Sequence, residues 1–403
     1  MSKRLLIPVL LIAALFAALL SAQSERERQD PVARLERRIA AGQAKIEYRN
    51  DGWGYLSSLL ENLDLQTDSQ LLVFSKTSLQ QEKIGPKTPR AIYFNDSVSV
   101  GGVQHGELYE VAAVDPVEGV VFYSLDTKRV DKPSFERQRS LCVICHGPVN
   151  VWAPGIMVAT VYPNADGSPF FMGGGELFHT TNHKSPFEER WGGWYVTGTH
   201  GSMTHRGNTW APDPYHPVEL LTEGTQNVTD LSSKFDVSKY FAPTSDLIAL
   251  MTFEHQTHIA NLIVRLNAQY RFLTSNELPP ARTPKQSDID KTIQEIVTYM
   301  LFEDEVPLTS PIKGVSSFTR TFPQRGPRDS KGRSLRDFDL KTRLFRYRLS
   351  YMIYSELFDA MNPKGLERVY QALYEKLQGT EPLEILRETK PNLPDYWRLQ
   401  PRP

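Results

Sequence analysis

A change in hydrophobic period is the feature that most restricts what this chain can fold into. Between residues 70 and 125, five short runs rich in β-branched and aromatic residues are separated by Asn-Asp, Gly-rich and Asp-Pro turn signals. The runs are QLLVFS, RAIYFND, VSVGGV, LYEVAAV and GVVFYSL. Runs of this length and spacing predict strands joined by hairpins, so we expect a β-meander in the first half of the chain.

Beyond Pro243 the period becomes helical, with Thr244 or Ser245 as the expected N-cap. Residues spaced three or four apart then form one stripe that faces the interior. The stripe consists of Ile248, Met251, His255, Ile259, Leu262 and Leu266. Further helices are predicted over residues 287–302, 339–360 and 366–377, with a basic, turn-rich surface loop at 319–337.

These patterns predict an α+β fold in which a strand-rich N-terminal half packs against a mainly helical C-terminal half. We expect a strand-rich region at 23–215 and a helical region at 216–403, as two domains or as one continuous domain. Two helices are predicted before the strands, at 30–43 and 54–63, and two more strand candidates lie at 155–162 and 190–198. A chain of 403 residues with 40% hydrophobic residues is long enough to bury a sizeable core.

The N-terminal segment MSKRLLIPVLLIAALFAALLSAQ has the pattern of a secretory signal peptide. Lys3 and Arg4 precede an apolar run that ends at the small residues Ser21 and Ala22. We predict a signal peptide at 1–22 and a protein that is periplasmic or otherwise exported. The alternative is an uncleaved membrane anchor, which Pro8 and the Ser-Ala cleavage site disfavour.

The charge balance gives no reason to expect a nucleic-acid partner. Lys and Arg total 46 and Asp and Glu total 47. The sequence also has no P-loop, no Gly-x-Ser-x-Gly elbow and no Gly-x-Gly-x-x-Gly that opens a helix. Nucleotide-binding and serine-hydrolase functions therefore have no motif to support them, and no catalytic residue is identified.

The stretch LCVICHG contains the only two cysteines, Cys142 and Cys145, followed directly by His146. In an oxidising compartment this pair is open to interpretation as a disulfide or as a thioredoxin-like redox couple. A zinc half-site is a further alternative, although it lacks a second pair of ligands. None of these alternatives uses the adjoining histidine.

Cys-x-x-Cys-His is the sequence signature of covalent haem attachment. Three residues make nearly one helical turn, so both sulfurs project from one side of a short helix and can join the two vinyl groups of one porphyrin. His146 would then be the proximal iron ligand. We predict one haem c, on a helix with Ser134 as N-cap that ends at Gly147. About 120 mature residues that read largely as strands precede the motif, which excludes a compact all-α cytochrome c.

The second axial position decides whether the iron moves electrons or binds a small molecule. The predicted distal candidates are His255, at the centre of its apolar stripe, and His205 and His183, in turn-rich segments after the motif. A core histidine bonded to a carbonyl is the plain alternative for His255. The other residues considered are His179, His200 and His258 and the thioether residues Met157, Met172 and Met203.

Seven segments together resemble a family of exported bacterial proteins described only as containing a cytochrome c domain. The segments are SKTSLQ, PRAIYFNDSVSVGG, DPVEGVVFYSLD, CVICH, RWGGWYVTGTHG with THRGN, EHQTH and GRSLRDFDLKTRLFRYRLSYMIYSELFD. The resemblance spans nearly all of the mature chain. It implies haem c bound through Cys142, Cys145 and His146, and a periplasmic redox function.

Three function classes follow for a monohaem protein of this kind. The first is an electron carrier that passes single electrons to a redox partner the sequence does not identify. The alternative is a haem enzyme with an open distal site, peroxidase-like or acting on another small ligand. A third class, in which the haem is purely structural, would show an inaccessible, very low reduction potential.

Overall fold

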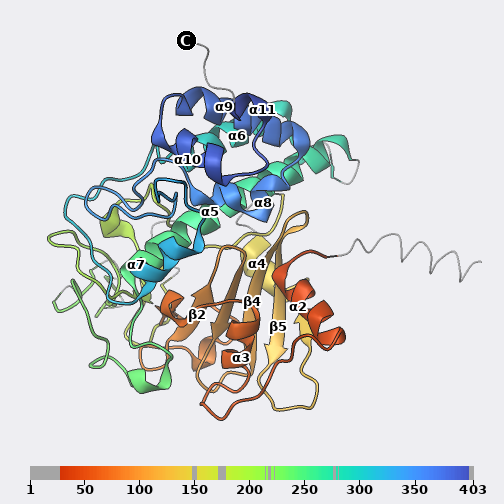
Figure 1. The fold of residues 1–403 in the computed structure, drawn as a ribbon. Coiled ribbons are helices and arrows are strands. Elements are labelled where there is room, and N and C mark those ends of the chain that lie inside the picture. The colour runs from red at the N-terminus through yellow and green to blue at the C-terminus, as the bar shows by residue number, and fades with distance from the viewer. Residues whose placement is uncertain are drawn as a thin grey trace, which may run out of the picture.

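The computed structural model describes residues 28–147, 152–170, 178–213, 215–216, 219–221, 223–275, 278–279 and 281–398. Within these residues the protein is a mixed α/β structure, with an antiparallel sheet in the N-terminal half and helices in the C-terminal half (Figure 1). The predicted signal segment at 1–22 and Met172 lie outside the described residues. No helix in the described part of the chain is both long and apolar enough to cross a bilayer.

The main sheet has seven strands in the order β6-β5-β4-β3-β2-β1-β9, and every neighbouring pair is antiparallel. The predicted meander is thereby confirmed, because β1 to β6 are neighbours in chain order. The strands are β1 (Leu71–Val73), β2 (Arg90–Phe94), β3 (Val98–Gly102), β4 (Leu108–Asp115), β5 (Gly119–Asp126), β6 (Phe135–Arg137) and β9 (Trp194–Tyr195). A separate two-stranded sheet contains β7 (Ala159–Val161) and β8 (Phe178–Thr180).

The two faces of the main sheet bury different cores, because side chains alternate along each strand. On one face, residues such as Tyr93, Tyr109 and Tyr123 pack in one cluster with residues of α2 (Pro31–Ala40) and α3 (Leu56–Asn62). On the other face, the side chains pack in a second cluster with residues of α5 (Leu247–Thr274). The strand residues of this second cluster include Ile92, Phe94, Val114, Val120 and Phe122.

Helix α5 lies between the sheet and the other C-terminal helices (Figure 1). Its N-cap is Asp246, one residue beyond the predicted Thr244 or Ser245, and the Asp246 carboxylate accepts from the amides of Ile248 and Ala249. The predicted stripe is interior, as expected. The face of α5 opposite the stripe is buried too. The reason is that α5 contacts the sheet on one side and, on the other side, the C-terminal helices α6 to α11 (residues 286–398), which we call the helical layer.

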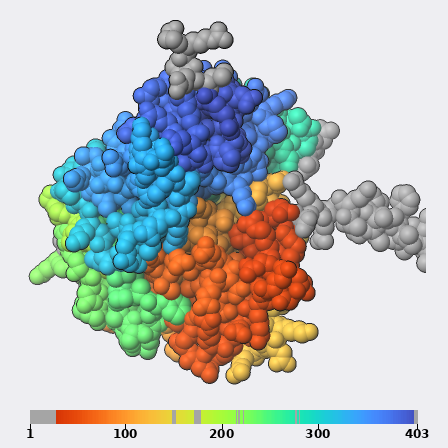
Figure 2. All heavy atoms as spheres, viewed as in Figure 1, coloured from red at the N-terminus to blue at the C-terminus, as the bar shows by residue number. Residues whose placement is uncertain are grey.

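The helical layer rests directly on the strand-rich half (Figure 2). Helix α6 (Gln286–Met300) packs on α5, and α9 (Pro363–Leu377) packs on α6, in agreement with the predicted helices at 287–302 and 366–377. The shorter helices are α7 (Phe318–Thr321), α8 (Glu356–Asp359), α10 (Glu381–Thr389) and α11 (Asp395–Arg398).

The helix predicted at 339–360 is wrong. The Asp339 carboxylate accepts from the amides of Lys341, Thr342 and Arg343, and this closes a turn in place of helical hydrogen bonds. Only a 3₁₀ turn, Tyr351–Tyr354, and the single-turn α8 are helical in this stretch. The hydrogen bonds of the Asp339 side chain to these amides stabilise the turn more than the helical spacing of apolar residues stabilises a helix.

The helix predicted to start at Ser134 is also different in the structure. Phe135–Arg137 pairs with β5 as the edge strand β6, so the backbone groups of Tyr123, Ser124 and Leu125 gain partners there. The helix that follows, α4, spans Leu141–His146 and is preceded by Ser140.

The candidate cofactor site around α4

Helix α4 carries both cysteines and His146 on less than two turns. Both thiols are free; Cys142 is half-buried against the cluster beneath α5, and Cys145 is exposed. The apolar side chains of Leu141 and Ile144 are 52% and 72% exposed. The helix therefore rests on the protein through Cys142 and leaves an apolar surface outside.

His146 has one ring nitrogen engaged and one available. Its Nδ1 lies 2.9 Å from the carbonyl oxygen of Gly155, and a carbonyl only accepts, so Nδ1 carries the proton and donates it. Its Nε2 makes no hydrogen bond to any residue that the structure describes. Burial lowers the pKa of His146, which keeps the imidazole neutral. This tautomer is the one that a histidine needs to bind a metal through Nε2.

The Gly155 carbonyl, which accepts from His146, is fixed through its neighbour Ile156 by the helix α5. The next residue, Ile156, donates its amide to the Asn261 side chain at 3.0 Å, and the Asn261 side-chain amide donates back to the Ile156 carbonyl at 2.5 Å. Phe122 of β5 supports the imidazole from the sheet, with ring centroids 4.7 Å apart. His146 is thus positioned by both the sheet and the central helix.

The pair Cys142 and Cys145 is poorly suited to thiol–disulfide exchange, because the Cys142 thiol ionises with difficulty. Burial raises the pKa of Cys142 to about 11, and the charges of Glu110 and Cys145 add to the effect. Reactive Cys-x-x-Cys thiols instead have a lowered pKa. Among the residues that the structure describes, no group of three or more His, Cys, Asp or Glu is arranged to hold a metal ion.

An ion pair between Arg90 and Glu110 lies near α4, and sequence reasoning missed it. Arg90 Nη1 donates to Glu110 Oε2 at 2.6 Å, and both side chains are 18% exposed. The pair acts on α4 electrostatically, because Arg90 lowers the pKa of His146 and Glu110 raises it. The only sequence signal was one carboxylate within the otherwise apolar strand LYEVAAV.

His255 and His183, two of the three predicted distal residues, lie together and contact each other. Their Nδ1 atoms are 3.1 Å apart, and His255 Nε2 lies 2.7 Å from Ser350 Oγ. Both rings stack with Tyr299 of α6. His255 therefore has protein partners at both nitrogens, whereas His183 Nε2 is buried without one.

These two histidines face the helical layer, whereas α4 packs on the sheet. On α5, the sheet is contacted by Phe253, whose ring lies 4.8 Å from Phe94, and by Gln256, which donates to the Asn95 carbonyl. No hydrogen bond or ring contact within the described ranges joins His146 to His183 or His255. The structure does not bring them together with α4, and the distal ligand stays a prediction.

His205, the third distal candidate, lies in another cluster with His200 and Phe187. Its Nδ1 accepts from the Gly207 amide at 3.0 Å, and burial lowers the pKa of His205 to about 3. The group of histidines that follows the cysteines in sequence is thus divided in space. Of the thioether candidates, Met203 is buried and Met157 is half-buried.

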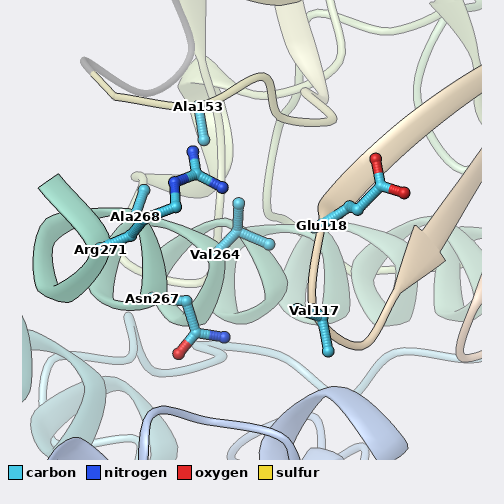
Figure 3. A pocket seen from close by; sticks show the side chains of 8 residues that line it. Val117, Glu118, Ala153, Val264, Asn267, Ala268 and Arg271 are labelled. Carbon is cyan, nitrogen blue, oxygen red and sulfur yellow. The ribbon is translucent and has the colours of Figure 1, made fainter. Parts of the chain in front are cut away.

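Two hollows accompany the α5 interface, and both are small. Figure 3 shows one of them, which is lined by Val117 and Glu118 of the β4–β5 turn and by Val264 and Arg271 of α5 and has a volume of only about 10 Å³. The other, also of about 10 Å³, is lined by residues of the β2–β3 turn and of α5. Pockets that enclose small ligands measure roughly 300–1,000 Å³. Neither hollow is large enough to enclose a macrocycle.

Comparisons with known proteins add no relative: no family model, no curated protein and no solved structure matches this chain.

Proposed function

We propose that this protein is an exported monohaem c-type cytochrome that carries single electrons. Cys142 and Cys145 would hold the haem covalently, and His146 would be the proximal ligand. The observation that carries the proposal is the state of His146. Its Nδ1–H is held by the Gly155 carbonyl, and its Nε2 lone pair is free beside two free thiols on the same short helix.

The residues around α4 fit such a group. Two unpaired thiols three residues apart can each add across one vinyl group, and the neutral imidazole can ligate iron without first losing a proton. A porphyrin would also cover the exposed Leu141 and Ile144 side chains. A bound haem supplies one-electron redox chemistry. The chain supplies the attachment, the orientation of His146 and a position open to a partner protein.

A second candidate function is a haem enzyme with an open sixth position. The observation that favours it is that His255 has protein partners at both nitrogens, and that His183 and His205 each use Nδ1 within the protein. A small ligand such as peroxide or nitric oxide would then be the natural occupant. His255, His205 and His183 remain the proposed ligands if the sixth position is filled by the protein.

The test is expression of the full chain in a host that matures c-type cytochromes, followed by optical spectroscopy and intact mass. We expect a coloured protein with the mass of one haem and no free thiols. C142A with C145A should abolish covalent attachment, and H146A should remove the wild-type axial spectrum. H216A, at an exposed histidine, is the matched control and should change nothing.

The outcome also separates the two candidates. A low-spin ferric spectrum supports electron transfer, and a high-spin spectrum that shifts with cyanide supports the enzyme. Colourless protein with both thiols free or joined to each other would contradict both. The mass of the mature N-terminus tests export, since cleavage after Ala22 is expected.

A further inference from the structure

The side chain of Arg90 has an unused hydrogen-bonding edge close to α4. Glu110 Oε2 accepts from Nη1 alone, and Arg90 Nε is buried without a partner. Nη2 likewise donates to none of the residues that the structure describes. Nε and Nη2 form one edge of the guanidinium, and two parallel N–H groups on such an edge match the two oxygens of a carboxylate.

Glu110 holds that edge in a fixed direction. Its other oxygen, Oε1, accepts from Ser78 Oγ at 3.0 Å, so the carboxylate is anchored at both oxygens. Arg90 on β2 and Glu110 on β4 meet across β3, above Gly101. A Cβ built on Gly101 would lie 3.7 Å from each of the two side chains, so both pass close over this glycine. Arg90 is therefore oriented before any ligand arrives.

The strand register places this pair beside His146. Ala112 of β4 is opposite Phe122 of β5, whose ring contacts His146, and Glu110 is two residues along the same face of β4. Ala112 and Cys142 both pack against the cluster that contains Phe122. The charge of Glu110 also raises the pKa of Cys142. Arg90 is thus the cation of the sheet face that supports α4.

We propose that Arg90 binds a propionate carboxylate of the haem through its Nε–Nη2 edge, with Glu110 as the residue that positions it. This inference rests on the proposed function, because the propionate is part of the haem. It also explains why the ion pair is partly buried at this place. The free edge of the guanidinium can donate two parallel hydrogen bonds to a second carboxylate, which is the geometry of a bidentate arginine–carboxylate pair.

The experiment uses haem-loaded protein and compares R90Q and R90K with the wild type. The readouts are the propionate bands of the resonance Raman spectrum and the reduction potential. Both variants should shift the propionate bands, because lysine keeps the charge but lacks the bidentate edge. Only R90Q should also lower the reduction potential clearly, since it removes a positive charge that disfavours the oxidised haem.

A matched control is R265Q. Arg265 also forms one partly buried ion pair, with Glu295, and also has a buried Nε without a partner, but it joins α5 to the helical layer. R265Q should change neither readout.

Unshifted propionate bands in R90Q and R90K would overturn the inference, even if the potential moved, because Arg90 would then act only through its electrostatic field. If R90Q does not fold, the bands of R90K decide alone. Protein without haem would instead refute the proposed function.

Discussion

His183 and His255 direct their Nδ1 atoms at each other across 3.1 Å in the interior of the helical half. Only one proton fits between the two atoms, so one ring donates and the other accepts. Ser350 then fixes the remaining nitrogen of His255 at 2.7 Å. The pair joins the segment after β8 to α5 and to the 3₁₀ turn at Tyr351–Tyr354.

From these contacts we predict that H255A loses stability, and the optical spectrum of haem-loaded H255A tests whether His255 is the distal ligand. The variant removes a fully buried ring and leaves His183 and Ser350 without their partner, which should lower the free energy of unfolding by about 2–4 kcal/mol. Urea denaturation measures the loss, and the optical spectrum is recorded on the folded protein. If the low-spin signal vanished in H255A alone, His255 would be the distal ligand.

Acid should destabilise the protein below about pH 6.5. Burial lowers the pKa of His255 and His205 to about 3 and that of His258 to about 4, whereas the unfolded chain takes up these protons near pH 6.5. The unfolded state therefore binds more protons as the pH falls, and each histidine costs at most about 1.4 kcal/mol per pH unit.

The check is the free energy of unfolding measured from pH 7 to pH 4.5. H258Q should reduce the slope, because it removes one of these titrating rings, which is half-buried in the folded protein. H216Q, at an exposed histidine beside Asp213, should not reduce it. A stability that is flat over this range would show that these rings are accessible to protons in the folded state.

The start of β5 should disfavour any side chain at Gly119. Its φ of +87° disfavours any L-residue, and an added Cβ would lie 2.7 Å from Val264 Cγ1 of α5. We expect G119A to lower the free energy of unfolding by about 1–3 kcal/mol. V264A should recover the steric part in the double variant, but not the part due to backbone strain; full additivity of the two losses would contradict this contact.

The meander and the long interior helix were predictable because their signals are local. Alternating β-rich runs and a three-to-four spacing report directly on which side of an element is buried. The helix at 339–360 failed for a local reason of another kind, since Asp339 and Ser350 bind backbone amides and end the pattern. The edge strand β6 was missed because strand pairing depends on a neighbour, and three residues carry little signal of their own.

In the site around α4 too, features with a local sequence signal were predictable and features set by tertiary contacts were not. The spacing of Cys142, Cys145 and His146 was readable from the sequence, because three residues make almost one turn of helix. The Gly155 carbonyl and the Asn261 side chain were not, because they act on His146 from a loop and from a helix more than 100 residues away. The same holds for His255: its interior position followed from the period, but its partner His183 is set by tertiary packing.

Asn261 should influence His146 from the far side of Gly155. Its two hydrogen bonds to Ile156 fix the loop whose carbonyl accepts from His146 Nδ1. In haem-loaded protein, N261L should weaken the hydrogen bond from His146 to the Gly155 carbonyl. The imidazole then gives less electron density to the iron, which raises the reduction potential.

The matched control is N267L on the same helix, because Asn267 accepts from the Asn362 amide in the helical layer. It should lose comparable stability and leave the potential unchanged. Equal shifts in both variants would mean that the potential responds to general loosening of α5 rather than to the hold on His146.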